Sequence, residues 1–143
     1  MLDWPDCRNV RDLGGVPTGD GGRIRSGVLI RADDLANLTD EGVDAVRAAG
    51  VRRIIDLRGS VVVHCAAGKD RTGVLVALAL SVAGVEPDEI AADYARTAEC
   101  RPETILGTLE HIVERYGDVP EYLLRHGMAW DELDALRARL REG

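Results

Sequence analysis

The chain has 143 residues, which is enough for one compact domain with a single hydrophobic core. Its composition, 45% hydrophobic and 30% charged, is typical of a soluble globular protein. The formal net charge of -7 argues against a general nucleic-acid binder, because such proteins carry a basic surface. It does not exclude small anionic substrates, since a few arginines and helix N-termini can form a positive pocket in an acidic protein.

The first half of the chain predicts short strands and one helix. Residues 1–27 are rich in Gly, Asp and Arg and indicate turns. A short strand is expected at 28–31, followed by a helix over 39–50 that Thr39 can cap and Gly50 can close. The runs 51–57 and 61–65 are apolar without alternation, a pattern typical of strands buried on both faces of a parallel sheet.

The second half predicts helices. Residues 72–83 are apolar nearly all round, which indicates a buried central helix that ends at Gly84. Prolines and glycines divide the rest into four further helices. The predicted fold class is one α/β domain over 1–143, with a small central, mostly parallel sheet flanked by helices and a helical C-terminal half. The four further helices are expected at 87–97, 102–116, 119–126 and 130–142.

The cysteine count and the apolar runs indicate the cellular location of the protein. Three cysteines form no even framework of disulfides, so a reducing compartment with free thiols is the simpler interpretation. The first residues have no basic start and no apolar run, so no signal peptide is visible. The longest apolar stretch, 74–85, is shorter than the ~20 residues that cross a bilayer. We expect a cytoplasmic protein without membrane insertion, and leave open secretion without a visible signal.

The segment VVVHCAAGKDRTG, residues 61–73, places a loop of small residues between a buried strand and a buried helix. Such a loop can turn successive backbone N–H groups inward and form an anion cradle at the positive end of the helix. Ala66, Ala67 and Gly68 keep this cradle free of bulky side chains. Cys65 would lie at its base, where the same N–H groups favour the nucleophilic thiolate.

Arg71 follows Cys65 by six residues. If the loop curls back, the planar guanidinium can bind two phosphoryl oxygens and stabilise the charge that spreads over them in the transition state. Thr72 could donate a hydrogen bond to the sulfur and improve it as a leaving group, and His64 could order the loop from behind. The simpler alternative is a buried core cysteine beside an arginine that begins a helix.

Three motifs carry a resemblance to a known family. HCAAGKDRTG at 64–73 resembles the signature of bacterial cysteine-dependent tyrosine and lipid phosphatases of the atypical dual-specificity type. Residues 9–15 match the NxRDxGG element of that family, and residues 55–58 are similar to its DLR element. The similarity extends into 27–50, 92–97 and 101–116, so it covers most of the chain. It implies a phosphatase-like fold and hydrolysis through a phosphocysteine intermediate without metal or cofactor.

The resemblance also implies the substrates and the supporting residues. Phosphotyrosine is implied, with phosphoserine or phosphothreonine and phosphoinositides left open. Lys69 is associated with tolerance of lipid phosphates, and with Arg58 it could offer charge to a multiply phosphorylated ring; alternatively it is a solvated loop charge. Substrate contacts are expected from the loop and Arg58. Three residues of the NxRDxGG element are expected to brace the loop: Asn9, Arg11 and Asp12.

A general acid is needed to protonate the leaving group. Asp56, in the DLR-like element at the end of a strand, is the residue that the family suggests, and Asp70 inside the loop is the second candidate. Asp56 could instead orient Arg71 or cap a turn.

One feature does not fit a phosphatase. The strands at 51–57 and 61–65 should be parallel, but only Arg58-Gly59-Ser60 joins them, whereas a parallel crossover usually needs a dozen or more residues. Family members carry a substantial segment here, often with a mobile lid. We consider three explanations: a segment lost between Arg58 and Val61, which we favour, a designed replacement by Gly59-Ser60, or exchange of elements between chains.

Two other classes of function compete with a phosphatase. A module that binds a phosphorylated ligand would keep the cradle but lack the lid or the acid. A sulfurtransferase would not need the DRT sequence, and an arsenate reductase would need resolving cysteines nearby. No metal is predicted, because His111 and His126 have no companions at ligand spacing. The expected partner is a phosphorylated protein or phosphoinositide, and the chain is expected to be a monomer or dimer.

Overall fold

The computed structural model describes residues 10–32, 40–48, 51–53, 60–64 and 70–142. Four strands in these ranges form one sheet in the order β1-β2-β4-β3. Strands β1 and β2 are antiparallel, whereas β4 is parallel to both β2 and β3, so the predicted mostly parallel sheet is confirmed. The strands are β1 (Arg11–Asp12), β2 (Leu29–Ala32), β3 (Val51–Arg53) and β4 (Ser60–His64).

Six helices follow the predicted positions closely, with bounds that differ by a few residues at most. Proline stands in the first turn of α3, α4 and α5, where its missing N–H costs no hydrogen bond. Gly84, just beyond α2, and Gly117, at the end of α4, adopt positive φ angles of 92° and 97° that other residues rarely reach. The helices are α1 (Asp40–Ala48), α2 (Asp70–Val82), α3 (Pro87–Ala95), α4 (Pro102–Tyr116), α5 (Val119–Arg125) and α6 (Trp130–Leu140).

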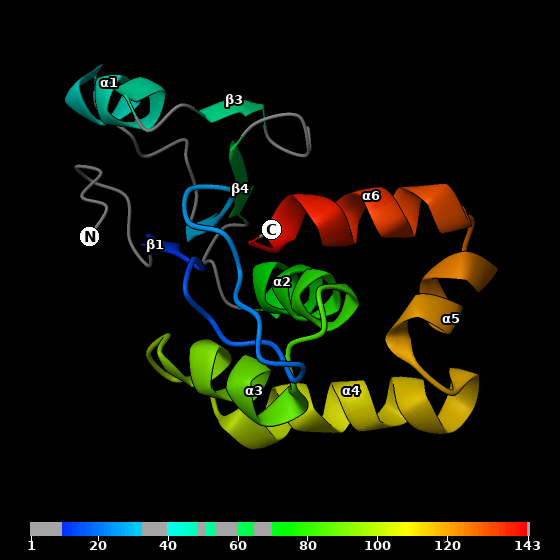
Figure 1. Ribbon diagram of the computed structural model, residues 1–143. Helices are drawn as coiled ribbons and strands as arrows, with labels where there is room; N and C mark the ends of the chain where they lie inside the picture. The colour runs from blue at the N-terminus through cyan, green and yellow to red at the C-terminus, as the bar shows by residue number, and fades with distance from the viewer. Residues whose placement is uncertain (1–9, 33–39, 49–50, 54–59, 65–69, 143) are drawn as a thin grey trace.

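Helix α2 lies at the centre of the molecule. It contacts β2 and β4 of the sheet, and α3, α4, α5 and α6 lie around it (Figure 1). Its inner positions, such as Val76 and Leu80, are almost fully buried, as its apolar sequence predicts. The prediction of burial on all sides is wrong at Val74 and Leu75, which are 38% and 45% exposed. None of the described helices is both long and apolar enough to cross a bilayer.

The connection between β3 and β4 is unusually short. The described part of β3 is Val51–Arg53, the predicted continuation to Leu57 lies outside the described residues, and β4 begins at Ser60, so only residues 54–59 separate two parallel neighbours. A crossover between parallel strands usually takes about a dozen residues or more. The predicted conflict between a parallel pair and a short link is therefore present in the structure, and its origin stays a prediction.

Candidate active site

The predicted loop, residues 65–69, lies outside the described residues, but the two elements that flank it in the sequence are described. Strand β4 ends at His64 and α2 begins at Asp70. Because β2 and β4 are parallel and Ala32 pairs with His64, the C-terminal ends of both strands reach the same edge of the sheet. Ligands of α/β proteins bind at this edge, and the free N–H groups at the start of α2 suit an anion there.

Many of the predicted site residues lie outside the residues that the structure describes. The described backbone reaches His64, Asp70 and Arg71, but their side chains are not described. The structure therefore leaves the nucleophile, the general acid and most of the substrate contacts as predictions. The residues outside the described ranges are Asn9, Asp56, Arg58, Cys65, Ala66, Ala67, Gly68 and Lys69.

Among the predicted site residues, Thr72 has a described side chain with a buried hydroxyl. It lies in the first turn of α2 and is 1% exposed. Its hydroxyl oxygen has no hydrogen-bond partner within the described part of the chain. A buried hydroxyl without a partner costs about 1–3 kcal/mol, so folded proteins rarely keep one without a function. The hydroxyl is available to a partner at the start of α2.

Tyr94 of α3 packs on the same turn of α2. A Cβ atom added to Gly73 would lie 2.6 Å from Cε2 and 2.9 Å from Cδ2 of the tyrosine ring. Glycine is therefore required at position 73, because any side chain there would overlap the buried ring. Sequence reasoning assigned Gly73 to the loop motif and missed Tyr94 as its partner.

A buried cluster of charges adjoins this contact. The Asp93 carboxylate accepts a hydrogen bond from Nε of Arg11 at 2.9 Å and another from Nη1 of Arg31 at 2.7 Å. Arg11 Nη2 also donates to the Asp93 carbonyl oxygen at 2.7 Å and to the Thr97 hydroxyl at 3.2 Å. All four residues are buried. One carboxylate thus holds β1 and β2 against the C-terminal end of α3.

The burial of this cluster affects the pKa of Arg11. Desolvation lowers the pKa of Arg11, and the hydrogen bond and charge of Asp93 oppose that effect. Buried charges are tolerated only when they are paired and hydrogen-bonded, as these are. The sequence did contain a signal for the cluster: Asp93 interrupts the apolar face of α3, and Arg31 interrupts an apolar strand. Neither residue was among the predicted site residues.

The two described members of the NxRDxGG element differ in what they touch. Arg11 reaches α3 through Asp93, the neighbour of Tyr94. The Asp12 carboxylate instead accepts hydrogen bonds from the backbone N–H of Gly14 at 2.9 Å and of Gly27 at 2.8 Å. Asp12 therefore organises the turns between β1 and β2, and its predicted role in bracing the loop stays untested.

Within the described ranges, no group of three His, Cys, Asp or Glu side chains is placed to hold a metal ion. Cys100 is a partly buried free thiol.

Comparison with known proteins gives a consistent result. The sequence profile described as the tyrosine phosphatase family matches residues 2–61 and 58–103, in two parts that meet at the short connection before β4. The triple specificity protein phosphatase PtpB of Mycobacterium tuberculosis is 45% identical over 56 residues, 39% of this chain and 20% of that protein. A tyrosine-protein phosphatase of Nostoc commune is 52% identical over 40 residues, 28% of this chain and 14% of that protein. The matched parts thus span a fifth or less of these curated relatives.

Proposed function

Because the chain belongs to the tyrosine phosphatase family, we propose that it hydrolyses phosphate monoesters through a phosphocysteine on Cys65. The Cys65 thiolate attacks phosphorus, and the P–O bond to the leaving alcohol breaks as that oxygen takes a proton from Asp56 or Asp70. A water molecule then attacks the phosphocysteine, which releases inorganic phosphate and restores the thiolate.

The observation that carries this proposal is the position of the two described elements on either side of residues 65–69. Strand β4 ends at the C-terminal edge of the parallel strands, and α2, the central helix, begins at Asp70. The first-turn N–H groups of a helix have no partner within the helix, and its dipole favours a negative charge. Both the thiolate and the phosphoryl group are anions, so this position favours both.

Thr72 supports the second step. Its buried hydroxyl, which has no partner among the described residues, is suited to donate a hydrogen bond to the sulfur of Cys65 as the phosphocysteine breaks down. Arg71 completes the proposal as the group that binds two phosphoryl oxygens.

Arg11 takes part in the proposal as a positioning residue. It binds Asp93, and the next residue, Tyr94, packs against Gly73 in the first turn of α2. Through these contacts the start of α2 has a fixed position relative to the sheet. A loop that must hold several N–H groups at one phosphate requires such support, because small displacements weaken every hydrogen bond at once.

The substrate class is proposed from the motifs and the relatives. Phosphotyrosine is the first candidate, and the name of the mycobacterial relative supports tests of phosphoserine and phosphothreonine as well. Lys69 and Arg58 support a test of phosphoinositides, since two cations beside the cradle would favour a multiply charged ring. The odd cysteine count supports a reducing, cytoplasmic location.

The decisive experiment is hydrolysis of para-nitrophenyl phosphate by the wild type, Cys65→Ser, Asp56→Ala and Asp70→Ala. We expect turnover by the wild type and none by Cys65→Ser, with vanadate binding retained in the serine variant. The general acid must carry a proton, so kcat should fall as the pH rises through its pKa, and the aspartate variant that loses this fall on the alkaline side identifies the general acid. A wild type that binds vanadate tightly without turnover would instead establish the phospho-ligand binding module.

A further inference from the structure

A second site lies on the side of α2 that faces α4 and α5. A pocket of about 300 Å³ opens there. Its lining contains none of the residues assigned to the phosphatase site, although Val74 follows Thr72 by only two residues. The lining comes from α2 (Val74, Leu78), from α4 (Thr108, His111, Ile112, Arg115, Tyr116) and from α5 (Tyr122).

The lining of the pocket is mostly apolar, and two of its aromatic rings pack against each other. Val74, Leu78 and Ile112 supply aliphatic surface. The rings of Tyr116 and Tyr122 meet edge to face with centroids 5.1 Å apart, so each ring limits the rotation of the other. A pocket with rigid walls loses little conformational entropy when a ligand enters.

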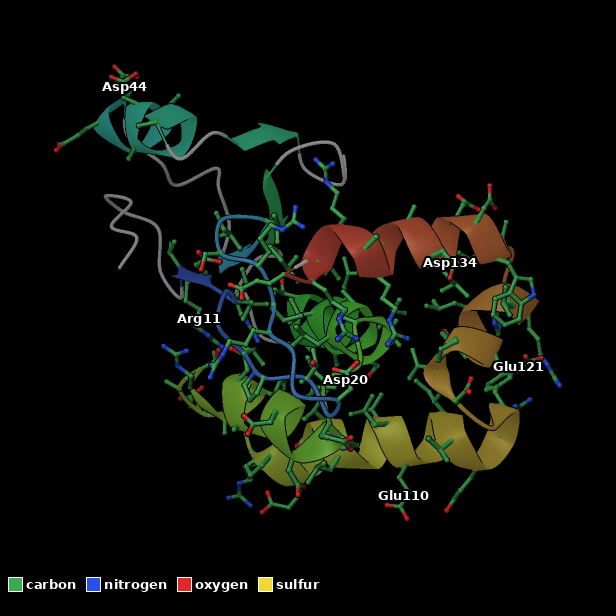
Figure 2. All side chains as sticks on the ribbon, viewed as in Figure 1. Arg11, Asp20, Asp44, Glu110, Glu121 and Asp134 are labelled. Carbon is green, nitrogen blue, oxygen red and sulfur yellow. The ribbon has the colours of Figure 1, made fainter. Side chains whose placement is uncertain are left out.

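The side chains that line the pocket include an arginine and a histidine but no acidic residue. His111 and Arg115 lie one turn apart on α4, and neither forms a salt bridge with another described residue. No carboxylate lines the pocket, although α4 and α5 carry several acids. Figure 2 shows Glu110 on the outer side of α4 and Glu121 away from the centre of the molecule, and Glu121 is paired with Arg125 at 3.2 Å.

This arrangement is unusual in a chain with a net charge of -7. Every polar side chain that lines the pocket can donate a hydrogen bond: the imidazole, the guanidinium, the two phenols and the hydroxyl of Thr108. A lining that combines apolar surface with hydrogen-bond donors is complementary to a ligand with an apolar body and a single anionic group.

We infer that this pocket binds a small amphiphile with a carboxylate headgroup and an unbranched alkyl body. The carboxylate would bind Arg115 and His111, and the alkyl chain would lie on Val74, Leu78 and Ile112. The volume sets the length of the chain. A pocket of this size holds roughly ten times the ~30 Å³ that a water molecule occupies in the liquid, so a body of about eight carbons fits.

The test uses calorimetric titration of the full chain with sodium octanoate and with 1-octanol, which has the same alkyl body and no charge. We expect one octanoate to bind per chain and octanol to bind at least tenfold more weakly. Arg115→Gln should weaken octanoate binding at least tenfold, whereas Arg101→Gln, an exposed arginine at the start of the same helix, should leave it unchanged. Absence of saturable binding, equal affinity for octanol, or equal effects of the two variants would overturn the inference.

The place of binding is tested separately by methyl NMR. Octanoate should shift the methyl signals of Val74, Leu78 and Ile112 and leave those of Leu133 and Leu136, buried residues of α6, unchanged. Shifts centred on α6 would place the ligand elsewhere and refute the site. Both measurements report binding directly, so their outcome does not depend on the proposed phosphatase activity.

Discussion

Tyr94 occupies the space into which a side chain at Gly73 would project. We therefore expect Gly73→Ala to lower the free energy of unfolding by about 1–3 kcal/mol, because the new methyl group must displace a buried ring or the first turn of α2. Turnover of para-nitrophenyl phosphate should fall as well, since this turn adjoins the proposed cradle. Urea denaturation and steady-state kinetics measure the two effects.

Gly107→Ala is the matched control for that change. Gly107 also lies within a helix, but a Cβ atom there would have no neighbour within 4 Å. The alanine should raise the free energy of unfolding by roughly 0.5–1 kcal/mol through its better helix propensity. Equal, stabilising effects at both glycines would contradict the close contact with Tyr94.

The Asp93 cluster predicts that a conservative change at Asp93 lowers the free energy of unfolding strongly. Asp93→Asn removes the charge that two buried arginines share, and breaking such a pair by changing one partner costs about 3–5 kcal/mol. Asp88→Asn, at an exposed position of the same helix, should change the free energy of unfolding by no more than about 0.5 kcal/mol. Comparable losses in the two variants would show that the buried pairing contributes little.

Thr72 and Thr97 are both buried threonines, and they should respond differently to valine. Thr97 accepts a hydrogen bond from Arg11, so Thr97→Val should cost about 1–3 kcal/mol of stability with little effect on turnover. Thr72→Val removes a buried hydroxyl without a partner in the described residues, so the free energy of unfolding should stay the same or rise. Breakdown of the phosphocysteine should slow roughly tenfold or more, a barrier increase of about 1.4 kcal/mol. Rapid-quench measurement of the intermediate decides this, and unchanged decay would remove Thr72 from the mechanism.

Asp20 predicts how stability depends on pH. Hydrogen bonds from the Thr18 hydroxyl and from Arg141, at 2.6 Å and 2.7 Å, hold the pKa of Asp20 well below its ordinary value. A carboxylate with a lowered pKa in the folded state stabilises the fold above its unfolded pKa of about 3.9. That contribution disappears as the pH falls further.

Asp20→Asn should therefore be less stable than the wild type at pH 7, and the difference should shrink as the pH falls from about 4 towards 2. Thermal unfolding across this range provides the measurement. Asp134→Asn, on an exposed stretch of α6, is the control and should show no such convergence. A gap between wild type and Asp20→Asn that stays constant down to pH 2 would refute the linkage.

The helical half of the fold was predictable because its signals are local. Proline begins and glycine ends several helices, and α4 has the predicted bounds, Pro102–Tyr116. Strand β1 was missed, because two residues just before a glycine-rich turn carry no periodic pattern. It pairs with β2 through the register of Arg11 with Arg31, which is a tertiary relationship that no short window of sequence contains.

The sequence predicted the two elements that flank the candidate site. It did not predict the buried contacts that hold these elements in place. Strand β4 and helix α2, on either side of residues 65–69, follow from the apolar runs that flank a stretch of small residues. The contacts of Asp93 join residues 82 and 62 positions apart, so only the fold brings them together. A charged residue on an otherwise apolar helix face was the available signal, since it must find a buried partner.

The long span of the Asp20–Arg141 contact has a consequence for how the protein is made. Arg141 binds both carboxylate oxygens of Asp20, and the N–H of Arg25 donates to the Leu140 carbonyl oxygen. On a ribosome the turn at 18–25 leaves the exit tunnel long before these partners are translated. Residues 18–25 therefore stay partly solvated until α6 has been translated and packs against them. A chaperone that binds nascent chains would act in that interval.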